Sequence, residues 1–335
     1  MKYIKVTVIF LIFIVILHFT TKLLSPKYMT DLVEGAFTRE YYEEEKNHEV
    51  IFIGDCEVYA NFSPMILYEE EGITSYVRGN SQQLIWQSYG LLKETLKYET
   101  PKIVVFNVNA MRYDKPISEA YNRLMLDQMK WSKEKIEIIK ASMLEEEDFL
   151  SYLFPILRYH SRFSTLTEED FKYLFKKKKI THNGFLINKN VKPVKNLPTK
   201  KRLPNYEFKE NTYEYLDKIV DLCKENNIKL ILIKAPSLYP YWYEEYDKQI
   251  EEYAEKHNLD YYNFTSQIDQ IGLDFQKDTY DGGLHLNLSG ATKLSKYFSK
   301  ILKENYSLTD YRENKEISQI YNQKLKEYYK AIKEE

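Results

Sequence analysis

Cysteine is nearly absent from this 335-residue sequence, which contains only Cys56 and Cys223. Cys223 lies in residues 213–226, where apolar positions recur at a helical spacing and share one face. Cys56 follows an apolar run that predicts a strand, at the opposite edge of the expected sheet. A disulfide requires Cα atoms within about 7 Å. This arrangement excludes one, so we interpret Cys223 as a small core residue.

Other classes of function are excluded by what the sequence has little of. The six histidines are scattered and show no metal-ligand spacing, so no metal is expected. No glycine-rich phosphate-binding loop occurs, and no cofactor is expected. The net charge of −2 gives no reason to expect nucleic acid as a partner. The one basic cluster, residues 176–179, is more typical of a solvated loop than of a phosphate site.

One long hydrophobic run is present, at the N-terminus. Residues 6–19 are almost entirely apolar, and their flanks extend the run toward the ~20 residues that a transmembrane helix needs. No small-residue cleavage signal follows and the run has no polar face, so residues 1–24 predict a retained signal anchor. Lys2 and Lys5 favour a cytoplasmic N-terminus. We therefore expect a single-pass protein of a bacterial cell membrane, with a linker at residues 25–48 and an extracytoplasmic body.

The body of the sequence alternates strand and helix patterns. Short apolar runs predict strands, and longer amphipathic runs predict helices between them. This alternation predicts an α/β fold over residues 49–307, a doubly wound, three-layer parallel sheet whose ligands bind at the carboxyl ends of the strands. The predicted strands are 49–54, 73–78, 102–108, 229–234 and 260–264, and the predicted helices are 81–98, 213–226, 243–257 and 288–305.

Two segments depart from this alternation. A large, mostly helical insertion at about residues 110–210 would act as a lid or acceptor-recognition subdomain if it lay over the strand ends, and a purely structural cap is an equal alternative. The tail, residues 308–335, is charged and helical without a clear core face. We expect the tail to pack late in folding or to project from the domain.

The most informative motif stands at the end of the first predicted strand, which leads into Cys56. The loop before the last predicted helix contains Asp281 and His285. A nucleophile at a strand end, with a His and an Asp from a distant loop, is typical of acyl transfer. His285 would then activate the thiol and lower its pKa toward neutral. The alternatives are a packing role for Cys56 and, for His285, a place without chemistry near a helix N-cap at Asn287.

These motifs resemble the SGNH/GDSL hydrolase superfamily, whose fold is flavodoxin-like. The first block of that family, Gly-Asp-Ser, is Gly54-Asp55-Cys56 here, and its last block, Asp-x-x-His, is Asp281 and His285. Cys replaces the family's Ser, and Asp281 stands four residues before His285 instead of three. The sequence is most similar to the membrane-anchored branch that modifies cell-surface polymers, which includes the teichoic-acid D-alanylation protein DltD.

The resemblance also implies an oxyanion hole. Its donors would be the backbone N–H groups of Cys56 and Gly79 and the side chain of Asn109. The position of the third block's Gly holds Asn107. Donors of this kind contribute ~3 kcal/mol each when they face a developing oxyanion. A turn-forming role is the alternative for Asn109.

Two further groups are candidate substrate-binding residues. Tyr239, Tyr241 and Trp242 follow the fourth predicted strand, where aromatic faces would stack on sugar rings or pack against the lid. His160 and Arg162 form a polar cluster in an apolar part of the insertion and are candidates for binding substrate charge.

Together these features predict a membrane-anchored acyltransferase or esterase that acts on acyl groups of a cell-envelope polysaccharide or teichoic-acid-like polymer. Cys56 would be the nucleophile, His285 the general base and then acid, and Asp281 the carboxylate that orients it. A thioester intermediate would make transfer to a sugar hydroxyl downhill. The resemblance also implies a membrane-bound O-acyltransferase partner. The alternative is a catalytically inactive SGNH fold that serves as a binding or scaffold subunit of an envelope-polymer modification complex.

Overall fold

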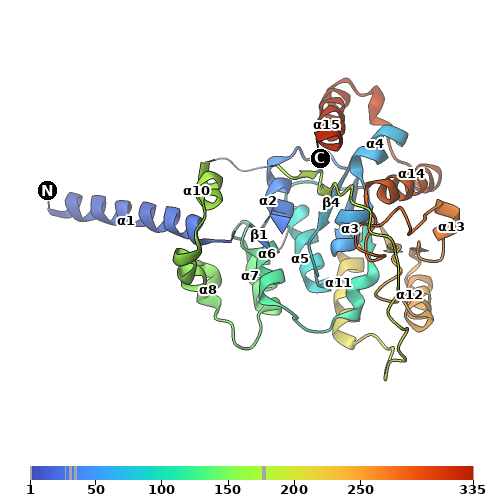
Figure 1. The fold of residues 1–335 in the computed structure, drawn as a ribbon, viewed down its shortest axis with the longest axis horizontal. Coiled ribbons are helices and arrows are strands. Elements are labelled where there is room, and N and C mark those ends of the chain that lie inside the picture. The colour runs from blue at the N-terminus through green and yellow to red at the C-terminus, as the bar shows by residue number, and fades with distance from the viewer. Residues whose placement is uncertain (1, 27, 30–31, 34–35, 176–178, 335) are drawn as a thin grey trace.

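The computed structural model describes residues 2–26, 28–29, 32–33, 36–175 and 179–334, so most of the basic cluster at 176–179 lies outside it. At the centre is a five-stranded parallel sheet in the order β4-β3-β5-β8-β9 (Figure 1). This is the flavodoxin-like strand order, and it confirms the predicted α/β fold. The strands are β3 (Val50–Gly54), β4 (Ser75–Gly79), β5 (Ile103–Asn107), β8 (Lys229–Lys234) and β9 (Asp260–Asn263).

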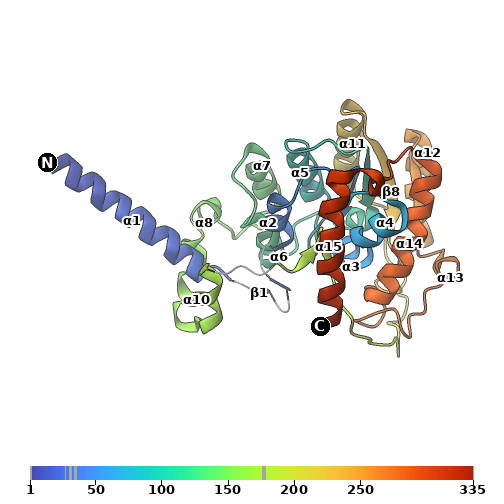
Figure 2. The ribbon, with the colours of Figure 1, turned by 90° about the horizontal axis from the view of Figure 1, so that it is seen from above.

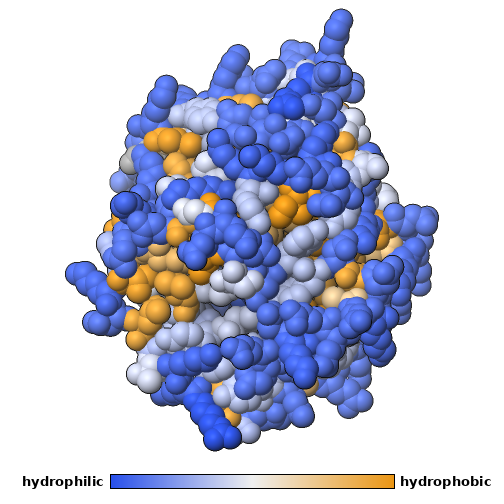
Figure 3. Space-filling model, turned by 90° about the vertical axis from the view of Figure 1, so that its right-hand side faces the viewer, coloured by the Kyte–Doolittle hydropathy of each residue, from blue (hydrophilic) through white to orange (hydrophobic). Residues whose placement is uncertain are grey.

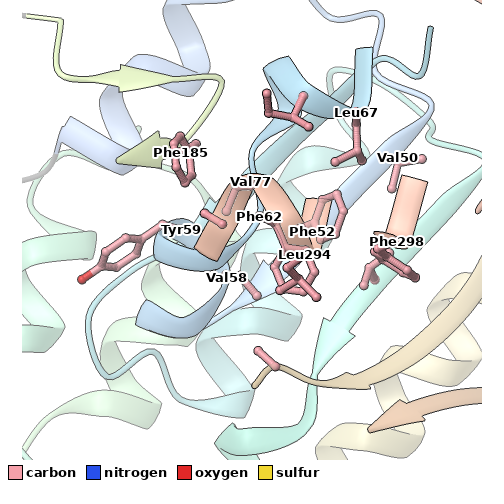
Figure 4. Close-up of a cluster of buried hydrophobic side chains, with 14 of the residues drawn as sticks. Val50, Phe52, Val58, Tyr59, Phe62, Leu67, Val77, Phe185, Leu294 and Phe298 are labelled. Atoms are coloured by element: carbon pink, nitrogen blue, oxygen red, sulfur yellow. The ribbon is translucent and has the colours of Figure 1, made fainter. Parts of the chain in front are cut away.

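Helices cover both faces of the sheet and complete the three predicted layers. Phe52 of β3 packs against Phe62 and Phe298, at ring-centroid distances of 5.0 and 6.1 Å (Figure 4). Ile51 and Ile53 belong to the core of the other face. Because the strands are buried on both faces, they are continuous apolar runs in the sequence. The first face is covered by α3 (Cys56–Asn61), α4 (Pro64–Glu71), α14 (Leu288–Asn305) and α15 (Lys315–Glu334), and the second by α5 (Ile85–Thr95), α11 (Glu210–Glu225) and α12 (Glu244–His257).

Two segments outside the predicted domain belong to its core. α2 (Ala36–Glu43) lies within the predicted linker, is buried along most of its length and contacts the edge strand β4. In the tail, α15 buries Tyr321 and Tyr328 completely, and Lys324 forms an ion pair of 2.6 Å with Glu44. The expectations of a linker and of a tail without a core face were therefore wrong. The fully buried tyrosines Tyr41 of α2 and Tyr321 and Tyr328 of α15 supply part of the apolar area of these segments, and a pattern based on aliphatic residues overlooks them.

Helix α1 (Lys2–Leu24) projects from the body (Figures 1 and 2). Its segment Tyr3–Leu24 is long and apolar enough to span a membrane, and residues 3–16 are exposed along their whole length. A helix that is hydrophobic all round needs an apolar environment. The structure thus agrees with the expected anchor, while its topology across the membrane stays a prediction.

The helical part of the insertion does not cover the strand ends. Its first helices, α6 (Glu119–Leu126) and α7 (Lys133–Ser142), extend the layer that contains α5. The next elements lie beside the C-terminal end of α1 (Figures 1 and 2): α8 (Phe149–Leu153), α9 (Ile156–Tyr159), η2 (His160–Thr165) and α10 (Glu168–Phe175). Of the two alternatives for the insertion, these helices therefore do not form the lid over the strand ends.

Among the described residues of the insertion, Tyr113 at its start lies near Asp55 and Cys56, and its last part runs near the loops at the carboxyl ends of the strands. This last part follows the hairpin of β6 (Thr181–His182) and β7 (Phe185–Leu186), and we call residues 187–204 the strap. In the strap, the backbone N–H of Lys192 donates to the carbonyl of Thr279 at 2.9 Å. The strap therefore borders the loop that contains Asp281 and His285.

Candidate active site

Asp281 and His285 are hydrogen-bonded to each other in the loop before α14. Oδ2 of Asp281 lies 2.6 Å from Nδ1 of His285, and Oδ1 accepts the backbone N–H of His285 at 2.9 Å. The turn between them contains Gly282 and Gly283, with φ angles of +84° and +104°. These left-handed values favour glycine. They turn the chain back, so that a carboxylate four residues before the histidine still reaches its ring.

The carboxylate orients the imidazole and sets its protonation. Because Asp281 accepts at Nδ1, we infer that this nitrogen carries the hydrogen and that Nε2 is left for a reactant. Burial raises the pKa of the Asp281 carboxyl, but hydrogen bonds from His285 outweigh it and hold the pKa below its ordinary value. Burial lowers the pKa of His285, but the neighbouring Cys56 and Asp281 outweigh it and raise that pKa well above its ordinary value.

Cys56 is the first residue of α3 and is partly exposed. Cys56 lies close enough to the His285 imidazole to affect its pKa, so the structure brings Cys56, His285 and Asp281 together in one site. Burial raises the pKa of the Cys56 thiol; His285 lowers it, the Asp55 and Glu57 carboxylates raise it, and the net shift is upward. The expected lowering of this pKa was therefore wrong, because two carboxylates flank the thiol in a desolvated position.

A buried polar network lies at the carboxyl ends of β3, β5 and β8. Lys234 Nζ lies 2.8 and 2.9 Å from the two carboxylate oxygens of Glu57. Nδ2 of Asn107 donates to Glu57 Oε2 at 2.8 Å and to Asp55 Oδ1 at 3.1 Å. All four residues are buried. The network ties the ends of three strands together around the residues on either side of Cys56.

The sequence prediction missed three residues that position this site. Lys234 ends an apolar strand, and a charge there needs a counter-charge at the same sheet edge. Glu57, directly after the candidate nucleophile, is that counter-charge. The ion pair could therefore have been predicted from the sequence. No sequence pattern indicated the role of Asn61. Its Oδ1 accepts the backbone N–H of Leu286 at 3.0 Å and so joins α3 to the loop of His285.

The expected oxyanion donors lie at the same edge of the sheet. Gly79 ends β4 opposite Gly54, and a side chain there would come within 2.5 Å of Val58, so only glycine fits beneath α3. Asn109 lies in the 3₁₀ helix η1 (Val108–Arg112), and its Nδ2 donates to Asp55 Oδ2 at 2.6 Å. The amide is thus held in place by a carboxylate at the site, and its action on an oxyanion stays a prediction.

The candidate aromatic residues after β8 differ in their contacts. Tyr239 is exposed, the hydroxyl of Tyr241 donates to the carbonyl of Pro198 in the strap, and Nε1 of Trp242 donates to Asp247 Oδ1 at 3.1 Å. Tyr241 thus contacts the strap and Trp242 contacts α12, and stacking on sugar rings stays a prediction.

The aromatic ring that stacks on His285 belongs to Tyr280, which is not one of the candidate aromatic residues after β8. Tyr280 stacks on the imidazole of His285 at a centroid distance of 5.6 Å.

Among the described residues, no group of three or more His, Cys, Asp or Glu could hold a metal ion.

His160 and Arg162 lie away from the strand ends, in η2 beside α1. Nη1 of Arg162 donates to the carbonyl of Leu24 at 2.7 Å, and Nη2 donates to Asp170 at 3.1 Å. The exposed His160 ring lies 3.0 Å from the carbonyl of Leu157. The two residues thus lie in the insertion, apart from Cys56, and a role in binding substrate charge stays a prediction. Arg162 ties the insertion to the end of the anchor helix.

The sequence matches no family model and no curated protein. The solved structures that are similar to the chain include two with 12% sequence identity each. A presumed acylhydrolase from Bacteroides fragilis has a TM-score of 0.39 and covers 80% of this chain and 94% of its own. A GDSL-like lipase from Bacteroides thetaiotaomicron has a TM-score of 0.37 and covers 79% and 94%. Likenesses this distant do not bear on activity.

The two cysteines should differ in their reaction with iodoacetamide. Cys56 is partly exposed, whereas Cys223 is 1% exposed in α11 and burial raises its pKa to about 12. We expect Cys56 to be alkylated first in the native protein. Because its pKa is also raised, its rate should keep rising above pH ~8.5, the ordinary thiol pKa. Peptide mass spectrometry at a series of pH values measures both rates, and a plateau of the Cys56 rate at neutral pH would contradict the raised pKa.

Proposed function

We propose that the protein is a membrane-anchored, extracytoplasmic acyltransferase or esterase that acts on acyl groups of a cell-envelope polysaccharide. The observation that carries the proposal is the hydrogen bond of 2.6 Å between Asp281 and His285 in the same site as the thiol of Cys56. A carboxylate, an imidazole and a nucleophile in that order are the components of covalent acyl-transfer catalysis. The proposed membrane-bound O-acyltransferase partner would supply the acyl group.

In the proposed mechanism, Nε2 of His285 takes the proton of the Cys56 thiol as the sulfur attacks the acyl carbonyl carbon. The carbon–sulfur bond forms, the ester carbon–oxygen bond breaks, and the alcohol leaves with the proton from His285. An acceptor hydroxyl or water then attacks the thioester and gives its proton to His285; the carbon–sulfur bond breaks, and the leaving sulfur takes that proton back from His285. Asp281 stabilises the imidazolium in both steps. Backbone N–H groups of Cys56 and Gly79 are the proposed oxyanion donors.

A thiol whose pKa is raised needs a general base at the moment of attack. The proton stays on the sulfur until a substrate arrives, and it is taken by the unprotonated form of His285, whose share is reduced by the raised pKa of that residue. This differs from proteins in which a preformed thiolate waits beside an imidazolium. The thioester would be reactive enough for transfer to a sugar hydroxyl, which favours acyl transfer among the possible outcomes.

A second candidate is a catalytically inactive scaffold subunit of an envelope-polymer modification complex. Two observations favour it: the thiol pKa is raised, and the Asn109 amide donates to Asp55. Both would weaken a covalent catalyst. A scaffold needs the fold and its surfaces, and it needs no acyl group on Cys56.

Mapping of an acyl adduct tests the enzyme proposal. The full-length protein is incubated with p-nitrophenyl acetate, quenched in acid and digested. We expect one acetyl group on the peptide that contains Cys56, and we expect neutral hydroxylamine to remove it, because thioesters are cleaved under conditions that leave ordinary esters intact. The peptide that contains Cys223 serves as the internal control and should stay unmodified. Equal acetylation of the two cysteines would contradict a dedicated nucleophile at Cys56.

A further inference from the structure

Residues 149–175, which we call the collar, comprise α8, α9, η2 and α10 and carry a concentration of exposed apolar side chains. About half of the large hydrophobic side chains that are exposed outside α1, among the described residues, belong to this short segment. Phe163 is 74% exposed and Phe175 is 86% exposed. Apolar surface gathered in this way marks an interaction site. The side chains are Leu150, Leu153, Phe154, Leu157, Phe163, Phe171 and Phe175.

The collar surrounds the end of α1. Figures 1 and 2 show α8 and α10 on opposite sides of the C-terminal end of that helix, and both views agree. Leu24, the last residue of α1, is buried, and its carbonyl accepts a hydrogen bond from Arg162 of the collar at 2.7 Å. Residues 3–16 of α1 are exposed. The collar therefore packs on the last turns of α1 and leaves the rest uncovered.

The length of α1 places the collar at the surface of a bilayer. At ~1.5 Å per residue, the segment Tyr3–Leu24 spans roughly the ~30 Å of a hydrocarbon core. The end of α1 at Leu24 then coincides with the lipid–water interface. Side chains such as Phe and Leu, held at that depth, gain by insertion among the lipid headgroups and the first acyl carbons.

The rest of the surface supports a membrane as the occupant. Figure 3 shows the face of the molecule on the side away from α1, which is mostly hydrophilic with small, separate apolar patches. The apolar residues of the collar instead adjoin α1, the one helix within the described residues that is long and apolar enough to span a membrane. A soluble partner or a second copy of the chain would not require the patch to be at this place.

We propose that the collar docks on the lipid surface around α1 and so holds the site of Cys56 at a defined height and tilt above the membrane. This inference rests on the anchoring of α1 in the proposed function. Two contacts across the membrane surface, a spanning helix and a seated collar, restrict the body more than one helix joined through a flexible linker. A seated body suits a substrate that is itself attached to the envelope.

Tryptophan fluorescence in nanodiscs tests the proposal. The full chain, as Phe163→Trp, Phe171→Trp or the control Tyr239→Trp, is reconstituted in nanodiscs with and without brominated lipid, and the wild-type signal is subtracted. Tyr239 is a suitable control because it is an exposed aromatic residue of the body, at 42%. We expect brominated lipid to reduce the fluorescence of the added tryptophan at 163 and 171 about twofold and to leave that at 239 unchanged.

Two other outcomes would overturn the inference, and they differ in what else they affect. Incorporation of the protein without quenching at 163 and 171 would leave α1 as an anchor and assign the collar to a protein partner. Failure of the wild-type chain to co-elute with nanodiscs would remove both the anchor and the collar as membrane contacts. The acyl adduct on Cys56 is independent of either result.

Discussion

Cys56→Ala is expected to lower ester turnover by about 10⁴-fold or more, because no thioester forms without the sulfur. His285→Ala should be about as damaging, since a nucleophile and its base act as one unit and their losses do not add. Asp281→Asn should cost about 10⁴-fold, because an amide 2.6 Å from Nδ1 favours the wrong tautomer. Hydrolysis of p-nitrophenyl acetate by the purified full-length variants measures all three effects.

Cys223→Ala is the matched control, since it removes the other thiol from a buried position in α11 outside the site. It should keep the wild-type rate. Cys56→Ser should keep measurable turnover, because a hydroxyl can use the same His285. In cells, envelope-polymer acylation at normal levels of the Cys56→Ala protein separates enzyme from scaffold. Acylation equal to wild type would end the enzyme proposal and favour the scaffold.

The central sheet could be predicted because its strands are buried on both faces. Such strands are short continuous apolar runs, and β8 (Lys229–Lys234) and α14 (Leu288–Asn305) have the predicted bounds. Asn287 also caps α14, through its Oδ1 and the backbone N–H of Gly290 at 3.2 Å. Sequence patterns were therefore sufficient for elements whose bounds are set by their own residues, such as an apolar run or a helix N-cap.

The placement of α2, α15 and the collar could not be predicted in the same way. Each packs through contacts between segments far apart in the sequence, such as Lys324 with Glu44 and Arg162 with Leu24. A helical pattern predicts that a helix forms, and it does not say which neighbour covers the helix. The insertion was therefore correctly expected to be helical, but its pattern did not decide between a lid over the strand ends and a structural cap.

The site was predicted in part for a similar reason. Asp281 and His285 belong to one loop, so a short sequence motif was sufficient to predict them. Two glycines in left-handed conformations allow the contact despite the extra residue between them. The pKa of Cys56 depends on burial and on the carboxylates of Asp55 and Glu57. Burial is a property of the whole fold, and a short motif does not contain it.

Lys234→Met is expected to lower the free energy of unfolding by about 3–5 kcal/mol, because it leaves the charge of Glu57 buried without a counter-charge. Both side chains of this pair are almost fully buried, at 0% and 2% exposure. Urea titration of the full-length variant in one detergent, followed by circular dichroism, measures the loss. The rest of the network also loses a donor, since Lys234 Nζ lies 3.1 Å from Ser237 Oγ.

Lys229→Met, at the other end of β8, is the matched control. Lys229 pairs with Asp260 at 2.8 Å, the same distance as in the buried pair, but both partners are about two-fifths exposed. Exposed pairs contribute about 0–1 kcal/mol, so this variant should stay close to wild type. A loss from Lys234→Met no larger than that from Lys229→Met would contradict the importance of the buried pair.

The double variant Glu57→Gln/Lys234→Met distinguishes stability from positioning. Removing both charges removes the uncompensated one, so most of the stability should return. The ester turnover should stay low, because Glu57 directly follows Cys56 and its carboxylate also accepts from Asn107 at 2.8 Å. A stable double variant with wild-type turnover would restrict Lys234 and Glu57 to a structural role. A stable variant with reduced kcat would show that this ion pair holds the nucleophile in place.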